Sequence, residues 1–73
     1  MKEQDVKDLG FEFVKRYAHD QYHTNQYAKG ILTVEFTYEG KTLINYDLTI
    51  HEVFCEKITL DEIKILTPIL GKI

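Results

Sequence analysis

Hydrophobic and polar residues alternate with a period of two over several stretches of the chain. The alternation is clearest in residues 31–38, and it returns in residues 42–51 after the turn sequence Glu39-Gly40-Lys41. Side chains of a strand point alternately to its two faces, so each stretch predicts a strand with one buried face. Glycine adopts a positive φ without a steric clash, which suits a tight turn. We therefore predict an antiparallel hairpin over residues 31–51.

Shorter patterns predict three further elements. Residues 2–9 place Val6 and Leu9 three apart on one face of a short helix, which Gly10 ends. From Phe11 the period changes to two, and this predicts a first strand that ends near Tyr17. Residues 52–58 read as a last strand.

A longer helix is predicted from Leu60. Thr59-Leu60-Asp61-Glu62 has the form of a capping box, in which the threonine hydroxyl accepts from the N–H of Glu62 and the Glu62 carboxylate reaches back. Proline cannot donate to the carbonyl of Lys64, so we expect a kink or a separate final turn at Thr67-Pro68 and an end near Gly71. The apolar stripe of this helix is Ile63, Leu66 and Leu70, widened by Ile65 and Ile69.

Together these elements predict one α+β domain over residues 1–73. About four antiparallel strands form a meander, and the C-terminal helix packs across one face. The residues expected in the core of the sheet are Leu32, Val34, Phe36, Ile44, Tyr46, Leu48 and Ile50. The residues expected to face solvent are Thr33, Glu35, Thr37, Asn45, Asp47 and Thr49.

Residues 17–27 differ from the rest of the chain, because they hold three of the five tyrosines and two of the three histidines but few aliphatic side chains. Tyrosine combines a large apolar ring with a hydrogen-bonding tip, which suits a contact surface. The alternative is an ordinary long hairpin whose rings pack along the sheet edge. The predicted partner-binding residues are Tyr17, His19, Tyr22, His23, Asn25 and Tyr27.

Composition narrows the functional classes. The hydrophobic share of 44% is enough for a packed globule, and the formal charge of -3 is spread along the chain without a block of one sign. A nucleic-acid binder usually carries a basic stripe, and a protein mimic of DNA is usually far more acidic. The single cysteine, Cys55, excludes an intramolecular disulfide. The absence of a signal-like start or a long apolar run favours a soluble cytoplasmic protein.

Candidate catalytic and metal-binding sets are weak. His19 and His23 are four apart, but no third ligand accompanies them. Cys55 is separated from His51 by roughly 13 Å along a strand, so a buried cysteine is expected rather than a nucleophile. The carboxylates Glu35, Asp47, Glu52, Glu56, Asp61 and Glu62 show no recognisable pairing. We predict a protein that is not an enzyme and needs no metal or cofactor.

The layout resembles small uncharacterised proteins of phages and mobile elements. The likeness rests on Asp8-Leu9-Gly10-Phe11 at the start of the first strand, and on Ile58-Thr59-Leu60-Asp61-Glu62-Ile63 with Leu66 and Leu70 at the end. It implies a small domain that binds and blocks a host protein, such as a defence nuclease complex of the CRISPR type. The family supplies no active residues to transfer.

Three functional hypotheses follow. The first is a non-catalytic module that binds a larger protein or a nucleoprotein through the tyrosine-rich stretch. The second is a homo-oligomeric structural or regulatory protein that pairs through an exposed strand edge. The third, disfavoured by the acidic balance, is a small nucleic-acid binder that uses Lys15, Arg16 and Lys29 with the tyrosines.

Overall fold

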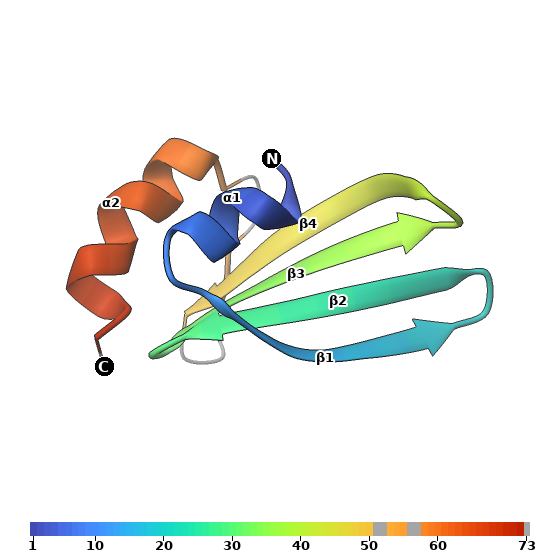
Figure 1. Ribbon diagram of the computed structural model, residues 1–73, viewed down its shortest axis with the longest axis horizontal. Helices are drawn as coiled ribbons and strands as arrows, with labels where there is room; N and C mark the ends of the chain where they lie inside the picture. The colour runs from blue at the N-terminus through green and yellow to red at the C-terminus, as the bar shows by residue number, and fades with distance from the viewer. Residues whose placement is uncertain (51–52, 56–57, 73) are drawn as a thin grey trace.

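The computed structural model describes residues 1–50, 53–55 and 58–72, with backbone alone for residues 54 and 55, and shows an antiparallel sheet with both helices on one face (Figure 1). The strands follow one another across the sheet in chain order, β1-β2-β3-β4-β5. The predicted α+β class and meander are therefore confirmed. The elements in chain order are α1 (Glu3–Asp8), β1 (Glu12–His19), β2 (Tyr22–Lys29), β3 (Leu32–Glu39), β4 (Thr42–Ile50), β5 (Val53–Cys55) and α2 (Leu60–Leu70).

Three tight turns join the four long strands. The paired residues that flank the turns are His19 and Tyr22, Lys29 and Leu32, and Glu39 and Thr42, so each turn has two residues. Two-residue hairpin loops need a positive φ at their first position. The residues there are Asp20 (φ 57°), Gly30 (φ 59°) and Gly40 (φ 60°).

The core lies between the sheet and the two helices. The predicted inward positions Leu32, Val34, Phe36 and Leu48 are fully buried, and Ile63 of α2 is buried against them. The remaining buried apolar residues are Val6, Phe11, Tyr27 and Ile58. Partly buried side chains that pack on this cluster include Tyr46, Ile50, Leu66 and Leu70.

Ile44 does not belong to the core, which corrects the sequence prediction. Its side chain is 50% exposed, because the register of β3 and β4 shifts after Thr37 and Tyr38 pairs with Leu43. An extra residue in one strand moves every following side chain to the other face. Leu43 therefore takes the inward position that strict alternation gives to Ile44, and it packs against the core.

Helix α2 begins at Leu60 and ends at Leu70, directly before Gly71, as predicted. The N–H of Glu62 donates to Thr59 Oγ1 at 3.2 Å, and the N–H of Thr59 donates to Glu62 Oε1 at 3.2 Å, which confirms the capping box. The helix runs through Pro68 to Leu70 without a separate final turn. Ile65 and Ile69 are 65% and 63% exposed, so they do not widen the buried stripe.

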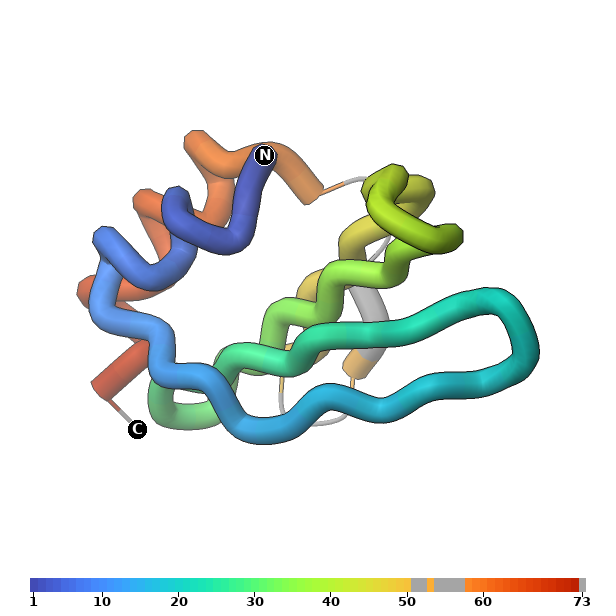
Figure 2. Tube along the Cα trace, turned by 45° about the vertical axis from the view of Figure 1, so that its right-hand side comes forward, coloured from blue at the N-terminus to red at the C-terminus, as the bar shows by residue number. Residues whose placement is uncertain are grey.

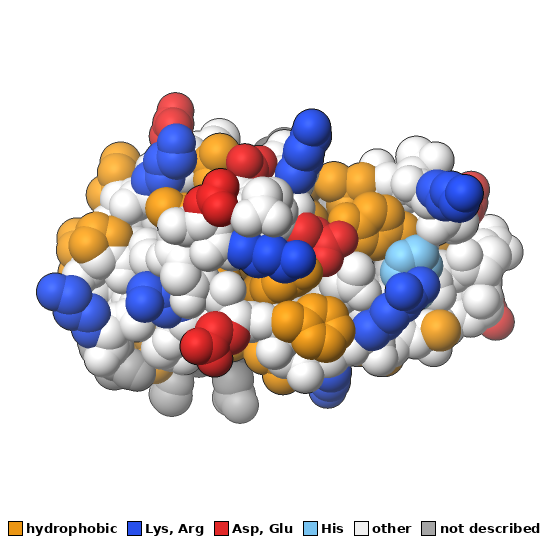
Figure 3. Space-filling model, in the orientation of Figure 1, with side chains coloured by type: hydrophobic (Ala, Val, Ile, Leu, Met, Phe, Trp, Pro, Cys, Tyr) orange, Lys and Arg blue, Asp and Glu red, His pale blue; other side chains and the backbone are white. Residues whose placement is uncertain are grey.

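The molecule is elongated, with extents of 36 × 21 × 19 Å. The helices cover one end of the sheet, and the turns at residues 20–21 and 40–41 project beyond them (Figures 1 and 2). Charged side chains of both signs are interspersed on the face in Figure 3, with apolar side chains between them. No helix in the described ranges is long and apolar enough to cross a membrane.

Candidate functional site: the tyrosine-rich hairpin

The tyrosine-rich stretch folds into the hairpin of β1 and β2. The structure thus contains a long hairpin, and its second strand, Tyr22–Lys29, was not predicted as a full strand. The register pairs Tyr17 with Thr24 and His19 with Tyr22. Because paired residues share a face, alternate side chains of the stretch point to opposite sides of the sheet.

The six candidate residues consequently separate into two groups. Tyr17, His19 and Tyr22 lie on the face opposite the helices, which we call the open face. His23, Asn25 and Tyr27 lie on the helix-side face, where their strand partners include the core residues Phe36 and Val34. No single surface can therefore use all six. The two histidines also lie on opposite faces, so they cannot bind one metal ion from the same side.

On the open face, Tyr17, His19 and Tyr22 form a row of rings. The ring centroids of Tyr17 and His19 are 6.0 Å apart, and those of His19 and Tyr22 are 5.9 Å apart. Tyr17 is 38% exposed, so much of its ring is accessible to another molecule. The Nζ of Lys15 lies 5.5 Å from the centroid of the Tyr17 ring, within the range of a cation–π contact.

Hydrogen bonds below this row hold the side chains in place. Tyr17 donates to Glu35 Oε2 at 2.7 Å, and Gln26 donates to the same oxygen at 3.0 Å. Thr24 is 2% exposed, and its hydroxyl contacts His19 Nε2 at 3.3 Å and Thr37 Oγ1 at 3.1 Å. The hydrogen bond to Glu35, with burial and the negative charge of that carboxylate, raises the pKa of Tyr17. Tyr17 is therefore a neutral, positioned donor at physiological pH.

On the helix-side face, three side chains of the sheet hold the carboxylate of Glu3. Tyr27 donates to Glu3 Oε1 at 2.5 Å, and Tyr38 donates to Glu3 Oε2. The Asn25 Nδ2 lies 3.1 Å and 3.2 Å from the two oxygens. Glu3 begins α1, so these bonds fix the short helix on the sheet. Asn25 and Tyr27 thus act in the interior of the protein, and Tyr27 is only 2% exposed.

The titration of this cluster follows from its hydrogen bonds. Burial by itself would raise the pKa of Glu3, but the donors Tyr27, Tyr38 and Asn25 and the charge of Lys7 outweigh it and lower that pKa. Burial and the bond to Glu3 raise the pKa of Tyr38 to about 12, and they raise the pKa of Tyr27 as well. The cluster is therefore one carboxylate with two neutral phenols at neutral pH.

His23 has a third environment, at the edge of this cluster. Its ring stacks on Tyr38 with centroids 5.0 Å apart and planes 11° apart. Asn25 Oδ1 is buried and has no hydrogen-bond partner among the described residues. His23 therefore flanks the Glu3 cluster, whereas Asn25 belongs to it through its bonds to the Glu3 carboxylate.

Sequence analysis missed Glu3 and Tyr38. Tyr38 alternates with the same period as Leu32, Val34 and Phe36, but it was not among the residues expected in the core. Glu3 precedes Val6 by three residues, so both lie on the same side of α1, and Val6 is fully buried. An acidic residue one helical turn before a buried apolar residue could have indicated that Glu3 faces the sheet.

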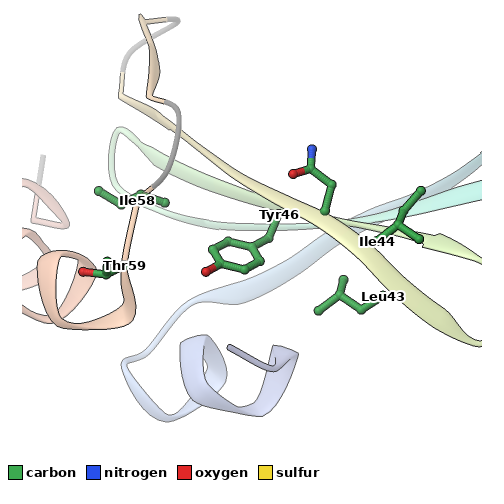
Figure 4. Close-up of a pocket in the computed structure, with 6 residues that line it drawn as sticks. Leu43, Ile44, Tyr46, Ile58 and Thr59 are labelled. Carbon is green, nitrogen blue, oxygen red and sulfur yellow. The ribbon is translucent and has the colours of Figure 1, made fainter.

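A pocket of about 450 Å³ lies between β4 and the start of α2 (Figure 4). Its described lining residues include no acidic, basic or histidine side chain, so it brings together no acid–base pair. The lining residues are Leu43, Ile44, Asn45, Tyr46, Ile58 and Thr59.

Only some of the carboxylate, cysteine and histidine residues considered as catalytic or metal-binding groups lie in the described part of the chain. Glu35 and Asp47 face each other across β3 and β4 on the open face. His51, Glu52, Glu56 and the Cys55 side chain lie outside the described part of the chain. Within that part, no group of three or more histidine, cysteine and acidic side chains is placed to hold a metal ion.

Comparisons with protein-family models, curated proteins and solved structures found no match to this chain. The functional proposal therefore rests on the residues themselves and on the geometry of the two faces.

Proposed function

We propose that this protein is a non-catalytic protein-binding module whose contact surface is the open face, centred on Tyr17, His19 and Tyr22. The observation that carries the proposal is the row of three rings on a face that neither helix covers. Tyrosine side chains are enriched at protein interfaces, because they bury a large area and lose little rotamer entropy.

The hairpin is a rigid base for such a surface. The open face keeps its side chains in place through the bonds of Tyr17 and Gln26 to Glu35, and through the buried hydroxyl of Thr24. Side chains that are already ordered lose less entropy when a partner binds. The proposed contact surface therefore consists of the side chains of this stretch that lie on the open face. Asn25 and Tyr27, on the helix-side face, hold α1 on the sheet.

The experiment is an affinity capture from bacterial lysate with the tagged protein, read by mass spectrometry. The test variant is Tyr17→Ala/His19→Ala/Tyr22→Ala, which removes the row and leaves the buried Tyr27 intact. The matched control is Ile65→Ala/Ile69→Ala, which removes two exposed apolar side chains from α2 on the opposite side. Circular dichroism must first show that both variants are folded.

We expect a stoichiometric protein partner that is lost in the first variant and retained in the second. A partner that is retained by the first variant and lost in the second would refute the open face as the contact surface. The resemblance to small phage proteins extends the proposal to a target that belongs to a host defence system. An assay of that target with and without the protein tests whether binding blocks its activity.

Self-association is the second candidate, and strand β1 favours it. This strand is at the edge of the sheet, and all eight of its residues are exposed. Exposed edges pair readily with other strands, but lysine near the middle of an edge opposes such pairing. Lys15 and Arg16 occupy the middle of β1, so we rank this candidate below the first.

The nucleic-acid alternative receives less support from the geometry. Lys15 pairs with Gln26 on the open face, whereas Arg16 pairs with Asn25 on the helix-side face. The Nζ of Lys29 lies beside Gly10 at the far end of β2. The three cations thus do not form one basic stripe.

A further inference from the structure

We propose that Asn25, Tyr27 and Tyr38 form a carboxylate-binding site, which Glu3 occupies in the native protein and which binds a free small carboxylate when Glu3 is shortened. The site lies on the helix-side face and is separate from the surface proposed for protein binding. The ligand class is a planar monocarboxylate, of which acetate is the simplest fitting member.

The donors come from two neighbouring strands and converge on one point. Asn25 and Tyr27 are two residues apart on β2 and share a face. Tyr38 lies opposite His23 on β3 and reaches the same carboxylate from the other side. Three donors to one ionised acceptor form a strong set, because each charge-assisted bond is roughly twice as strong as a neutral one.

The donors are held by the sheet rather than by Glu3. The Tyr27 ring meets the rings of Phe13 and Phe36 edge to face, with centroids 5.6 Å and 6.0 Å apart. The Tyr38 ring is held by its stack with His23. Shortening Glu3 therefore leaves the phenol groups in position with their acceptor removed.

The resident carboxylate belongs to a different element. Glu3 is in α1, a helix of six residues whose buried side chain is Val6. A free helix of this length is unstable in water, so α1 is ordered only by its docking. Ligand and receptor are thus on separate parts of the chain, and a free carboxylate can replace the tethered one.

The size of the space left by truncation selects acetate. A Glu3→Ala change removes the γ carbon and the carboxyl group, and acetate contains the same atoms. Lys7 adds favourable charge, since it already helps to lower the pKa of Glu3. Propionate is one methylene too long for the same space, and chloride is a single atom that cannot fill the two oxygen positions to which Tyr27 and Tyr38 donate separately.

The experiment compares thermal unfolding of the full-length Glu3→Ala protein in sodium acetate and in sodium chloride at equal ionic strength and neutral pH. A ligand that binds only the folded state raises the midpoint. At about 0.5 M acetate we expect the midpoint of Glu3→Ala to rise by about 3–6 °C over its value in chloride. The wild-type midpoint should rise by clearly less, because the tethered Glu3 carboxylate outcompetes free acetate and only the general stabilising effect of the acetate ion remains.

Two controls make the result specific. The double variant Glu3→Ala/Tyr38→Phe lacks one donor and should lose most of the acetate effect. Glu39→Ala removes an exposed glutamate and should show the same small acetate effect as the wild type. If Glu3→Ala is partly unfolded in chloride, acetate should raise its folded fraction, which circular dichroism measures directly. Equal midpoints in acetate and chloride, or an equal acetate effect in the double variant, would overturn the assignment.

Discussion

The Glu3 carboxylate joins α1 to two strands, and the cost of removing a partner follows from its charge. Tyr38→Phe deletes one donor while the ring and its stack with His23 remain. Hydrogen bonds to charged groups contribute about 1.5–3 kcal/mol, so we expect the unfolding free energy to fall by about 2 kcal/mol. Urea unfolding of the variant measures this loss.

Tyr46→Phe is the matched control for that measurement. Tyr46 is partly buried on the same face, and its hydroxyl makes no hydrogen bond with the described residues. We expect its change to stay within about 0.5 kcal/mol. Equal losses in the two variants would show that the Glu3 bond adds no stability.

The lowered pKa of Glu3 predicts how stability depends on pH. A carboxyl group whose pKa is lower in the folded state stabilises the protein at every pH above its ordinary pKa. That ordinary pKa is 4.5 for Glu3. That contribution decreases as the pH falls through the folded pKa. The groups that face the carboxyl are Lys7, Asn25, Tyr27 and Tyr38.

The measurement is the difference in unfolding free energy between the wild type and Glu3→Gln as a function of pH. We expect a constant difference above about pH 6 that shrinks as the pH falls below 4.5. A difference that stayed constant down to pH 2 would contradict the assignment, because it would not depend on ionisation of Glu3.

At the scale of elements, the β2–β3 turn packs closely on the end of α2. A Cβ at Gly30 would lie 2.8 Å from the backbone carbonyl of Gly71, whereas a Cβ at Gly40 would meet nothing within 4 Å. Both glycines have nearly the same positive φ, 59° and 60°. The two sites therefore share the same backbone strain but differ in steric contact.

Replacing Gly30 or Gly40 by alanine should lower the unfolding free energy by different amounts. Gly40→Ala should lower the unfolding free energy by about 1–2 kcal/mol, the cost of a left-handed conformation for a residue with a Cβ. Gly30→Ala should cost clearly more, by at least about 1 kcal/mol, because the turn must also move away from α2. Thermal or urea unfolding compares them, and equal losses would mean that the turn and the helix do not pack as closely as described.

The elements that were predicted correctly are those whose defining residues lie close together in the sequence. The strands around Gly40 and the helix capped by Thr59 and Glu62 were predicted because alternation, turn and cap all lie within a few residues. The register shift at Tyr38 was not predictable from alternation, since an extra residue in a strand leaves no signal in its own pattern. Ile44 was misplaced for that reason.

Strand β2 was missed because its inward side chains are polar. Its inner positions are His23, Asn25 and Tyr27, and a strand pattern is normally recognised by aliphatic inner residues. These side chains contact Glu3 and Tyr38, which are distant in the sequence. The candidate site was therefore found as a segment, but its division between two faces needed the long-range register.

At the scale of the whole molecule, the exposed edge of β1 determines whether copies associate. Antiparallel pairing of two β1 strands about their middle would bring Lys15 and Arg16 of one copy close to the same residues of the other. Like charges opposite each other on neighbouring strands are destabilising. We therefore expect the wild-type protein to be monomeric by light scattering at concentrations near 1 mM.

Removing these two charges tests the role of the edge directly. Lys15→Thr/Arg16→Thr replaces them with a residue that favours strands, so we expect concentration-dependent dimers in sedimentation velocity. Lys41→Thr/Lys64→Thr is the control, because it removes the same number of charges from the β3–β4 turn and from α2, away from the edge. Dimers in both variants would indicate an effect of net charge alone. A wild-type protein that was already dimeric would show that β1 pairs despite its charges, and self-association would then replace partner binding as the better-supported function.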